Sequence, residues 1–119
     1  MVMALTRPAP SSPKALPEVD IELFTFVERY ATNLVRMDLL IFFGGNPEER
    51  ITAADLARAV RRSLRATKKE LDDLTYLRVL TRRYTPEKTT YQLARKGAAR
   101  RAVMRLATYA RDKIQQNGE

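Results

Sequence analysis

The sequence predicts a mainly α-helical protein with one small β-hairpin. Apolar residues recur at helical spacing over four stretches of the chain, and a β-rich stretch with a turn signal separates the third from the fourth. With 119 residues the chain is long enough for one domain with a modest core, which we expect over residues 18–119. Residues 1–17 are expected to be a disordered arm, because they hold four of the six prolines, two charges and no periodicity.

The first helix is predicted over residues 20–43, where a wide apolar stripe follows one side. The stripe consists of Leu23, Val27, Tyr30, Leu34, Met37 and Ile41, widened by Phe24, Ala31, Val35 and Phe42. Arg36 is expected among the polar residues on the other side. Gly44 and Gly45 are expected to end the helix, since glycine is a common helix terminator and Pro47 bars continuation. The surplus of apolar surface indicates packing against the last helix or a second subunit.

Two short helices separated by a tight turn are predicted over residues 52–74. Thr52 and Ser63 are the N-caps in this interpretation, because their hydroxyls can accept hydrogen bonds from the first backbone N–H groups of a helix. The apolar faces are formed by Leu56, Ala57, Val60, Leu64, Thr67, Leu71 and Leu74. Three cations share one exposed strip of the second helix: Arg65, Lys68 and Lys69. A helix with such a strip can lie in the major groove of DNA, where long donors reach base edges and phosphates.

A β-hairpin is predicted from residues 77–84 and 89–93, which are β-rich with partial alternation. Pro86 stands at the second position of the turn between them. The side chains expected to point inward are Val79, Thr81, Tyr91 and Leu93. Those expected on the outside and at the tip are Arg82 or Arg83 and Lys88. Ile51 is expected to form a strand of one or two residues before the Thr52 cap.

The last helix is predicted over residues 96–116, with an apolar seam near heptad spacing. The seam consists of Ala99, Val103, Leu106, Ala110 and Ile114. Its small residues allow another helix to approach closely. The seam can pack on the first helix within one monomer or take part in a dimer, and the surplus of apolar surface favours a homodimer.

The positive charge is concentrated in one segment of the chain. The whole chain has a net charge of +8, but residues 1–55 hold 5 Lys or Arg against 8 Asp or Glu. Residues 56–105 hold 15 Lys or Arg against 4 Asp or Glu, so this segment carries all of the excess. A solvated surface has both signs mixed, whereas a one-sided segment is typical of a protein that binds a polyanion. Nucleic acid is therefore the expected partner.

Several function classes are disfavoured by residues that the chain lacks. With no cysteine and no histidine there is no disulfide, thiolate chemistry, soft-metal site or imidazole catalysis, and we expect no cofactor and no metal. Asp72 and Asp73 are adjacent, but neighbouring helical residues point about 100° apart, so they do not form a catalytic pair. We therefore expect no enzyme. No apolar run approaches the length of a membrane span and no signal peptide is evident, which predicts a cytoplasmic protein.

Two motifs resemble winged helix-turn-helix regulators. The spacing of Leu56-Ala57, Val60, Ser63, Leu71 and Leu74 is similar to that of helix-turn-helix proteins, although Arg61 stands where the family has Gly and Thr67 where it often has Val. Residues 91–97, Tyr-Gln-Leu-Ala-Arg-Lys-Gly, resemble the Tyr-x-Leu-Thr-x-Lys-Gly that closes the wing in MarR- and PadR-type regulators, with Ala94 in place of Thr. The resemblance covers residues 50–97. It implies a recognition helix in the major groove, a wing on the minor groove or backbone, long flanking helices and dimeric binding to a near-palindromic site.

The predicted function is therefore sequence-specific binding of double-stranded DNA by a homodimeric transcriptional regulator. The predicted DNA-binding residues are Arg58, Arg61, Arg62, Ser63, Arg65, Lys68, Lys69, Arg82, Arg83 and Lys88. Arg65, Lys68 and Lys69 are expected to face the major groove. The residues expected to neutralise phosphates are Arg58, Arg61, Arg62, Arg82, Arg83 and Lys88. Three alternatives stay open: a winged helix that binds proteins, a non-specific or architectural nucleic-acid binder, and a protein that binds RNA or single strands.

Overall fold

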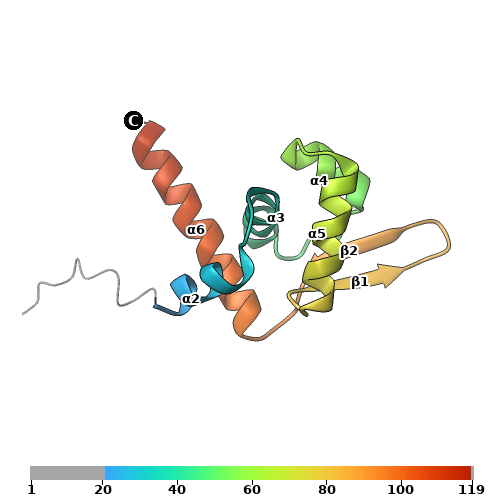
Figure 1. Ribbon diagram of the computed structural model, residues 1–119, viewed down its shortest axis with the longest axis horizontal. Helices are drawn as coiled ribbons and strands as arrows, with labels where there is room; N and C mark the ends of the chain where they lie inside the picture. The colour runs from blue at the N-terminus through green and yellow to red at the C-terminus, as the bar shows by residue number, and fades with distance from the viewer. Residues whose placement is uncertain (1–20, 119) are drawn as a thin grey trace, which may run out of the picture.

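The computed structural model describes residues 21–118, with side chains as far as Lys113 (Figure 1). This part contains five helices and one antiparallel hairpin, so the predicted fold class is confirmed. The elements are α2 (Ile21–Tyr30), α3 (Leu34–Gly45), α4 (Ala53–Val60), α5 (Leu64–Tyr76), β1 (Leu80–Tyr84), β2 (Thr89–Leu93) and α6 (Ala98–Gly118). The predicted arm over residues 1–17 lies outside the described residues, as does the side chain of Ile114.

The prediction of one helix over residues 20–43 is wrong, because the chain forms α2 and α3 there. Asn33 interrupts the helix with an extended backbone at φ −151° and ψ 169°. Its side-chain oxygen accepts a hydrogen bond from the Arg36 N–H at 2.8 Å, so Asn33 is the N-cap of α3. Asparagine is among the most favourable N-caps, and this local bond outweighs the continuous apolar stripe. Arg36 is thereby placed in the first turn of a new helix.

The predicted stop of the helix over residues 44–47 is confirmed, since α3 ends at Gly45 and Asn46 is its C-cap. The two glycines lie within the helix and do not form the left-handed cap that is common for glycine. A Cβ atom on Gly44 would come within 2.3 Å of the Val103 carbonyl oxygen and 2.7 Å of the Ala107 Cβ. Gly44 is therefore required because α3 packs directly against the backbone of α6 at this position. Local turn signals in the sequence cannot reveal this role, since the contact is with a distant helix.

The helix-turn-helix forms from the local signals that were predicted. Thr52 Oγ1 accepts from the Asp55 N–H and Ser63 Oγ accepts from the Ala66 N–H, each at 3.1 Å, which confirms both N-caps. Arg61, in the position where the resemblance implies Gly, adopts a left-handed backbone at φ 60°. The turn therefore has a backbone conformation that favours glycine, with a non-glycine residue in it.

The hairpin is confirmed, but its first strand begins later than predicted. Leu80 pairs with Leu93 and Tyr84 with Thr89, and Ile51 adds the predicted short bridge to Tyr91. Tyr91 and Leu93 are buried as expected. Thr81 is exposed, contrary to the prediction, and Leu80 is buried instead. Val79 is buried as expected, but its N–H donates to Leu74 O in the turn after α5, so β1 begins only at Leu80.

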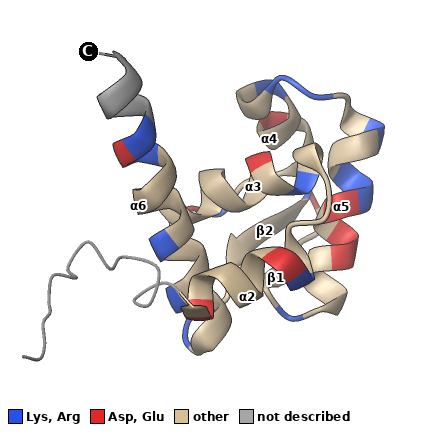
Figure 2. Ribbon diagram, turned by 60° about the vertical axis from the view of Figure 1, so that its left-hand side comes forward, with Lys and Arg blue, Asp and Glu red and all other residues tan. Residues whose placement is uncertain are grey.

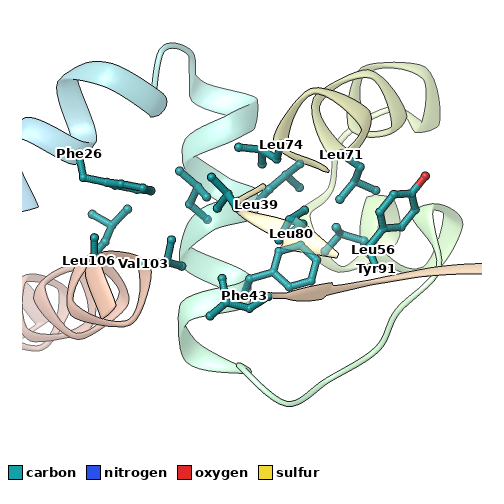
Figure 3. Packing of buried hydrophobic residues seen from close by; sticks show 14 of the residues in the cluster. Phe26, Leu39, Phe43, Leu56, Leu71, Leu74, Leu80, Tyr91, Val103 and Leu106 are labelled. Carbon is teal, nitrogen blue, oxygen red and sulfur yellow. The ribbon is translucent and has the colours of Figure 1, made fainter. Parts of the chain in front are cut away.

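The core lies on both sides of α3 (Figure 3). On one side, Phe26 of α2 meets Val103 and Leu106 of α6. On the other side, α4, α5 and the hairpin contribute fully buried residues, which include Leu56, Leu71, Leu74, Leu80, Tyr91 and Leu93. Helix α3 separates the two sets with Leu39 and Phe43, both fully buried. It thus joins the α2–α6 part of the molecule to the part that α4, α5 and the hairpin form.

Candidate nucleic-acid interface

The outer side of α5 is exposed and charged (Figure 2). The predicted strip of Arg65, Lys68 and Lys69 is exposed along its whole length. Lys68 Nζ lies 2.8 Å from Asp72 Oδ2 and Lys69 Nζ lies 3.0 Å from Asp73 Oδ2, one helical turn further on. In the described part of the chain Arg65 has no such acidic partner. All the N–H donors of the Arg65 guanidinium are therefore available to a ligand. Lys68 and Lys69 would have to give up their ion pairs with Asp72 and Asp73 before they could bind one.

The turn before α5 adds further cations around the N-terminal end of the helix. Arg61 is exposed at the C-cap of α4, and Arg62 pairs with Asp38 of α3 at 2.7 Å. Arg58 pairs with Asp55 within α4. Ser63, predicted as a site residue, is exposed and its hydroxyl caps α5, so its structural role is now defined. The structure brings these residues together with Arg65 at one end of α5.

The hairpin is fixed to α5 by Asp72. Its Oδ2 accepts from Lys68 Nζ, and its Oδ1 accepts from Arg82 Nη1 at 3.2 Å and from Tyr91 Oη at 3.1 Å. Burial tends to raise the pKa of Asp72, but the hydrogen bonds from Lys68 and Tyr91 and the charges of Lys68 and Arg82 outweigh it, so the pKa is lowered. Burial and the bond to Asp72 raise the pKa of the Tyr91 hydroxyl. The carboxylate thus connects one turn of α5 to both strands.

Helix α5 is held against α3 by a buried ion pair that was not predicted. Arg36 was expected on a polar surface, but it is 8% exposed and its Nε lies 2.8 Å from Glu70 Oε1. Arg36 also donates to Asp73 at 3.3 Å and to the Tyr30 carbonyl at 3.1 Å, and Asn33 Nδ2 donates to Glu70 at 3.1 Å. The acidic residues of α5 therefore fix its orientation. Asn33 is the sequence signal that could have revealed this role. As the N-cap it begins a new helix at Leu34, so the side of the helix on which Arg36 lies can no longer be counted from the preceding residues.

The predicted cations of the hairpin are separated onto different faces. Arg82 lies opposite Tyr91 on the face that contacts α5, and its guanidinium lies 5.2 Å from the Tyr84 ring. Arg83 pairs with Thr90 and so points to the opposite face, because successive side chains of a strand alternate. Lys88 is exposed at the end of the turn, where its N–H donates to Thr85 Oγ1 at 3.1 Å. Of these three cations, Arg82 is the one that contacts a residue of α5 in the described part of the chain, through Asp72.

Apolar side chains are also exposed near this surface. Leu64 was predicted on the buried face of α5, but it is 52% exposed in the first turn. The buried face begins instead at Thr67. Tyr76 and Tyr84 are 86% and 69% exposed, at the end of α5 and at the end of β1. The basic surface therefore includes a few apolar and aromatic groups as well as cations.

The described residues contain neither a membrane-spanning helix nor a group of acidic side chains that could hold a metal ion. No helix in residues 21–118 combines the length and apolar character that crossing a membrane requires. The described acidic side chains form no group of three that could hold a metal ion.

A helix-turn-helix followed by an antiparallel hairpin that packs on its second helix defines a winged helix, and the chain has this fold. Comparison of the sequence with protein-family models and with curated proteins finds no match. Solved structures do match. The AntR antimony-specific transcriptional repressor is 21% identical and covers 97% of this chain and 92% of its own, with a TM-score of 0.60.

Two further matches have the same architecture. The adhesin competence repressor AdcR of Streptococcus pyogenes is 17% identical and covers 90% of this chain and 78% of its own, with a TM-score of 0.58. MepR of Staphylococcus aureus in a complex with DNA is 14% identical and covers 89% of this chain and 86% of its own, with a TM-score of 0.57. These neighbours are MarR-family winged-helix regulators, so the resemblance inferred from the two motifs is confirmed for the fold.

Proposed function

We propose that the protein is a DNA-binding transcriptional regulator that inserts α5 into the major groove and places its hairpin on the adjacent backbone or minor groove. The observation that carries this proposal is the N-terminal half of α5, which is capped by Ser63, exposed and lined by cations. The match to MepR in a DNA complex supports the same use of the fold. Since that similarity lies at low identity, the assignment depends on the residues of α5.

Arg65 is the residue that we expect to read a base. Its side chain is exposed in the first two turns of α5 and has no acidic partner in the described part of the chain. Arginine can donate two hydrogen bonds to the O6 and N7 atoms of guanine, which gives sequence discrimination. The other predicted cations would contact phosphates: Arg58, Arg61, Arg62, Lys68, Lys69, Arg82, Arg83 and Lys88. Those bound to carboxylates would exchange that contact for a phosphate.

We further propose a homodimer formed through α2 and α6. Large apolar side chains of these helices are exposed: Ile21 and Phe24 are 64% and 65% exposed on α2, and Met104 and Tyr109 are 37% and 51% exposed on α6. Arg105 of α6 pairs with Glu22 of α2 at 3.0 Å, which holds the two helices together. Large exposed apolar side chains on two neighbouring helices are typical of a surface that a partner covers.

The base-reading role of Arg65 is tested by Arg65→Ala, with Arg101→Ala as a matched control. Arg101 is an exposed arginine of α6 outside the proposed interface. On a selected operator, loss of one bidentate base contact should weaken binding by about 1–3 kcal/mol and relax the preference for one base. The control should leave both unchanged. If Arg65→Ala weakens binding equally on the operator and on random duplexes, Arg65 contacts the backbone only.

The dimer is tested by sedimentation of Phe24→Glu, with Tyr76→Glu as a control that adds the same charge to an exposed aromatic position of α5. The wild type and the control should sediment as dimers, whereas Phe24→Glu should shift toward monomer. A monomeric wild type at micromolar concentration would contradict the proposed dimer without affecting the winged-helix assignment.

A second candidate function is a winged helix that binds proteins. The exposed Leu64 and Tyr84 favour it, since apolar groups in a basic surface provide contacts that DNA does not need. Absence of DNA binding even at low salt would support this candidate. Salt-sensitive binding without any sequence preference would instead indicate an architectural binder.

A further inference from the structure

The outer face of the hairpin, turned away from α5, contains a small polar hollow. Its volume is about 220 Å³, and its lining residues are Arg50, Thr81, Arg82, Arg83, Thr90, Gln92 and Arg95. Thr81, Arg83, Thr90 and Gln92 share this face by the strand register. Arg50 comes from the segment before α4, and Arg95 from the segment after β2. Residues of three chain segments thus converge on one hollow.

The hollow is positively charged and contains no acidic lining residue. Arg50, Arg83 and Arg95 make no ion pair in the part of the chain that the structure describes. By contrast, Arg82 is held by Asp72 on the other face of the hairpin, and Arg100 beyond β2 is held by Glu48 at 2.8 Å. Three like charges that converge without a counter-charge repel one another, so the site is stabilised when an anion binds.

One arginine of the hollow is already oriented by a buried side chain. Gln92 is 8% exposed; its Oε1 accepts from Arg50 Nε at 3.2 Å, and its Nε2 donates to the Glu48 carbonyl at 3.3 Å. Because Nε of Arg50 is engaged, its two terminal nitrogens keep their donors for a ligand. Thr81 and Thr90 also line the hollow, and the Thr81 hydroxyl donates to Gln92 O at 3.4 Å. An arginine that is already oriented in this way reduces the entropy that binding costs.

We propose that this hollow binds a phosphate group. Guanidinium forks match phosphate oxygens geometrically, and a hollow of this size can hold one such group. The phosphate can come from DNA that flanks the site contacted by α5, or from a free phosphate-bearing molecule. The inference extends the phosphate contact proposed for Arg83 to a site that Arg50 and Arg95 complete. The hollow lies on the opposite face of the hairpin from α5, so binding of a free phosphate there does not require α5 to bind DNA.

The first arm of the test measures binding of inorganic phosphate and pyrophosphate by NMR titration, with chloride added to hold the ionic strength constant. The variants are Arg50→Gln combined with Arg95→Gln, and Arg101→Gln as an exposed single-charge control. We expect the wild type and the control to bind alike, with chemical-shift changes at Gln92 and Thr90. We expect the double variant to bind at least tenfold more weakly. In chloride the double variant should have a thermal midpoint no lower than that of the wild type, since the substituted side chains are exposed and their mutual repulsion is removed.

The second arm compares a duplex that covers only the half-sites with one extended by a helical turn on each side. If flanking DNA supplies the phosphate, the double variant should lower the log–log salt slope by about 0.9, the value for one phosphate, on the long duplex and leave it unchanged on the short one. If a free ligand is the source, only the first arm responds. The proposal is overturned if the double variant behaves like Arg101→Gln in both arms. Failure of α5 to bind DNA, with phosphate still bound, would refute the proposed function alone.

Discussion

Thr67 is a polar residue at a fully buried position of α5 where the related helix-turn-helix proteins often have valine. It is 0% exposed, and its hydroxyl has no hydrogen-bond partner among the described residues. Thr67→Val keeps the volume and removes the unsatisfied group, so we expect the free energy of unfolding to rise by about 1 kcal/mol. The control is Thr75→Val, which deletes a hydrogen bond to Leu71 O and should not stabilise. Urea unfolding measures the free energy of unfolding of both variants. A lower value for Thr67→Val than for the wild type would contradict the prediction.

Arg61 and Arg78 both end a helix with a left-handed backbone, at φ 60° and 66°. The residue after each donates its N–H back to the helix, from Arg62 to Ala57 O and from Val79 to Leu74 O, each at 3.0 Å. A non-glycine residue is strained there, so Arg61→Gly and Arg78→Gly should each stabilise by about 0.5–1 kcal/mol. Only Arg61→Gly should also weaken DNA binding, because only Arg61 is a proposed phosphate contact. Similar weakening by both changes would remove Arg61 from the site.

At the scale of elements, the buried pair of Arg36 and Glu70 holds α5 on α3. Arg36→Leu leaves Glu70, which is 6% exposed, with only Lys69 at 3.8 Å as a nearby cation. Removing one partner of a buried pair should cost about 3–5 kcal/mol of unfolding free energy. Arg36→Leu combined with Glu70→Leu should recover much of that loss, because no buried charge then remains. If the double variant is less stable than Arg36→Leu alone, the pair is not the source of the effect.

Asp72 connects α5 to the hairpin and should contribute to acid sensitivity. Its pKa is lower in the folded protein than in the unfolded chain, so its stabilisation is present above about pH 4 and is lost as pH falls through the lowered pKa. Between pH 5 and pH 2 the free energy of unfolding of Asp72→Asn should therefore fall by less than that of the wild type, because the variant has no carboxylate to protonate at this position. Urea unfolding at each pH measures this difference. The control is Asp112→Asn on the exposed surface of α6, which should follow the wild-type curve. An unchanged pH dependence in Asp72→Asn would exclude this contribution.

The accuracy of the sequence predictions depended on whether the determining contact was local. The caps at Thr52 and Ser63 were predicted because each depends on a hydrogen bond three residues away. The break at Asn33 was missed although its capping bond is also local, because the apolar stripe continues through it. Arg36 and Gly44 could not be assigned, since their roles are set by Glu70 and Val103, far away in the chain. The same reason applies to Arg50 and Arg95.

At the scale of the whole molecule, α3 separates two parts of the chain. The segment of residues 56–105 that carries the excess charge forms α4, α5 and the hairpin on one side and extends into the first part of α6 on the other. Helices α2 and α6, which carry the exposed apolar residues, lie together on that other side of α3 (Figure 1). A dimer formed through those helices would carry two copies of α5, which is the arrangement that an inverted repeat requires.

The most direct measurement of the central claim is selection of bound sequences from a pool of random duplex DNA, with salt raised from low to physiological concentration. The account predicts recovery of an inverted repeat with half-sites about one helical turn apart. Binding should weaken with salt with a slope of about 0.9 per phosphate contact. Absence of binding at low salt would contradict the claim that α5 and the hairpin form a DNA interface.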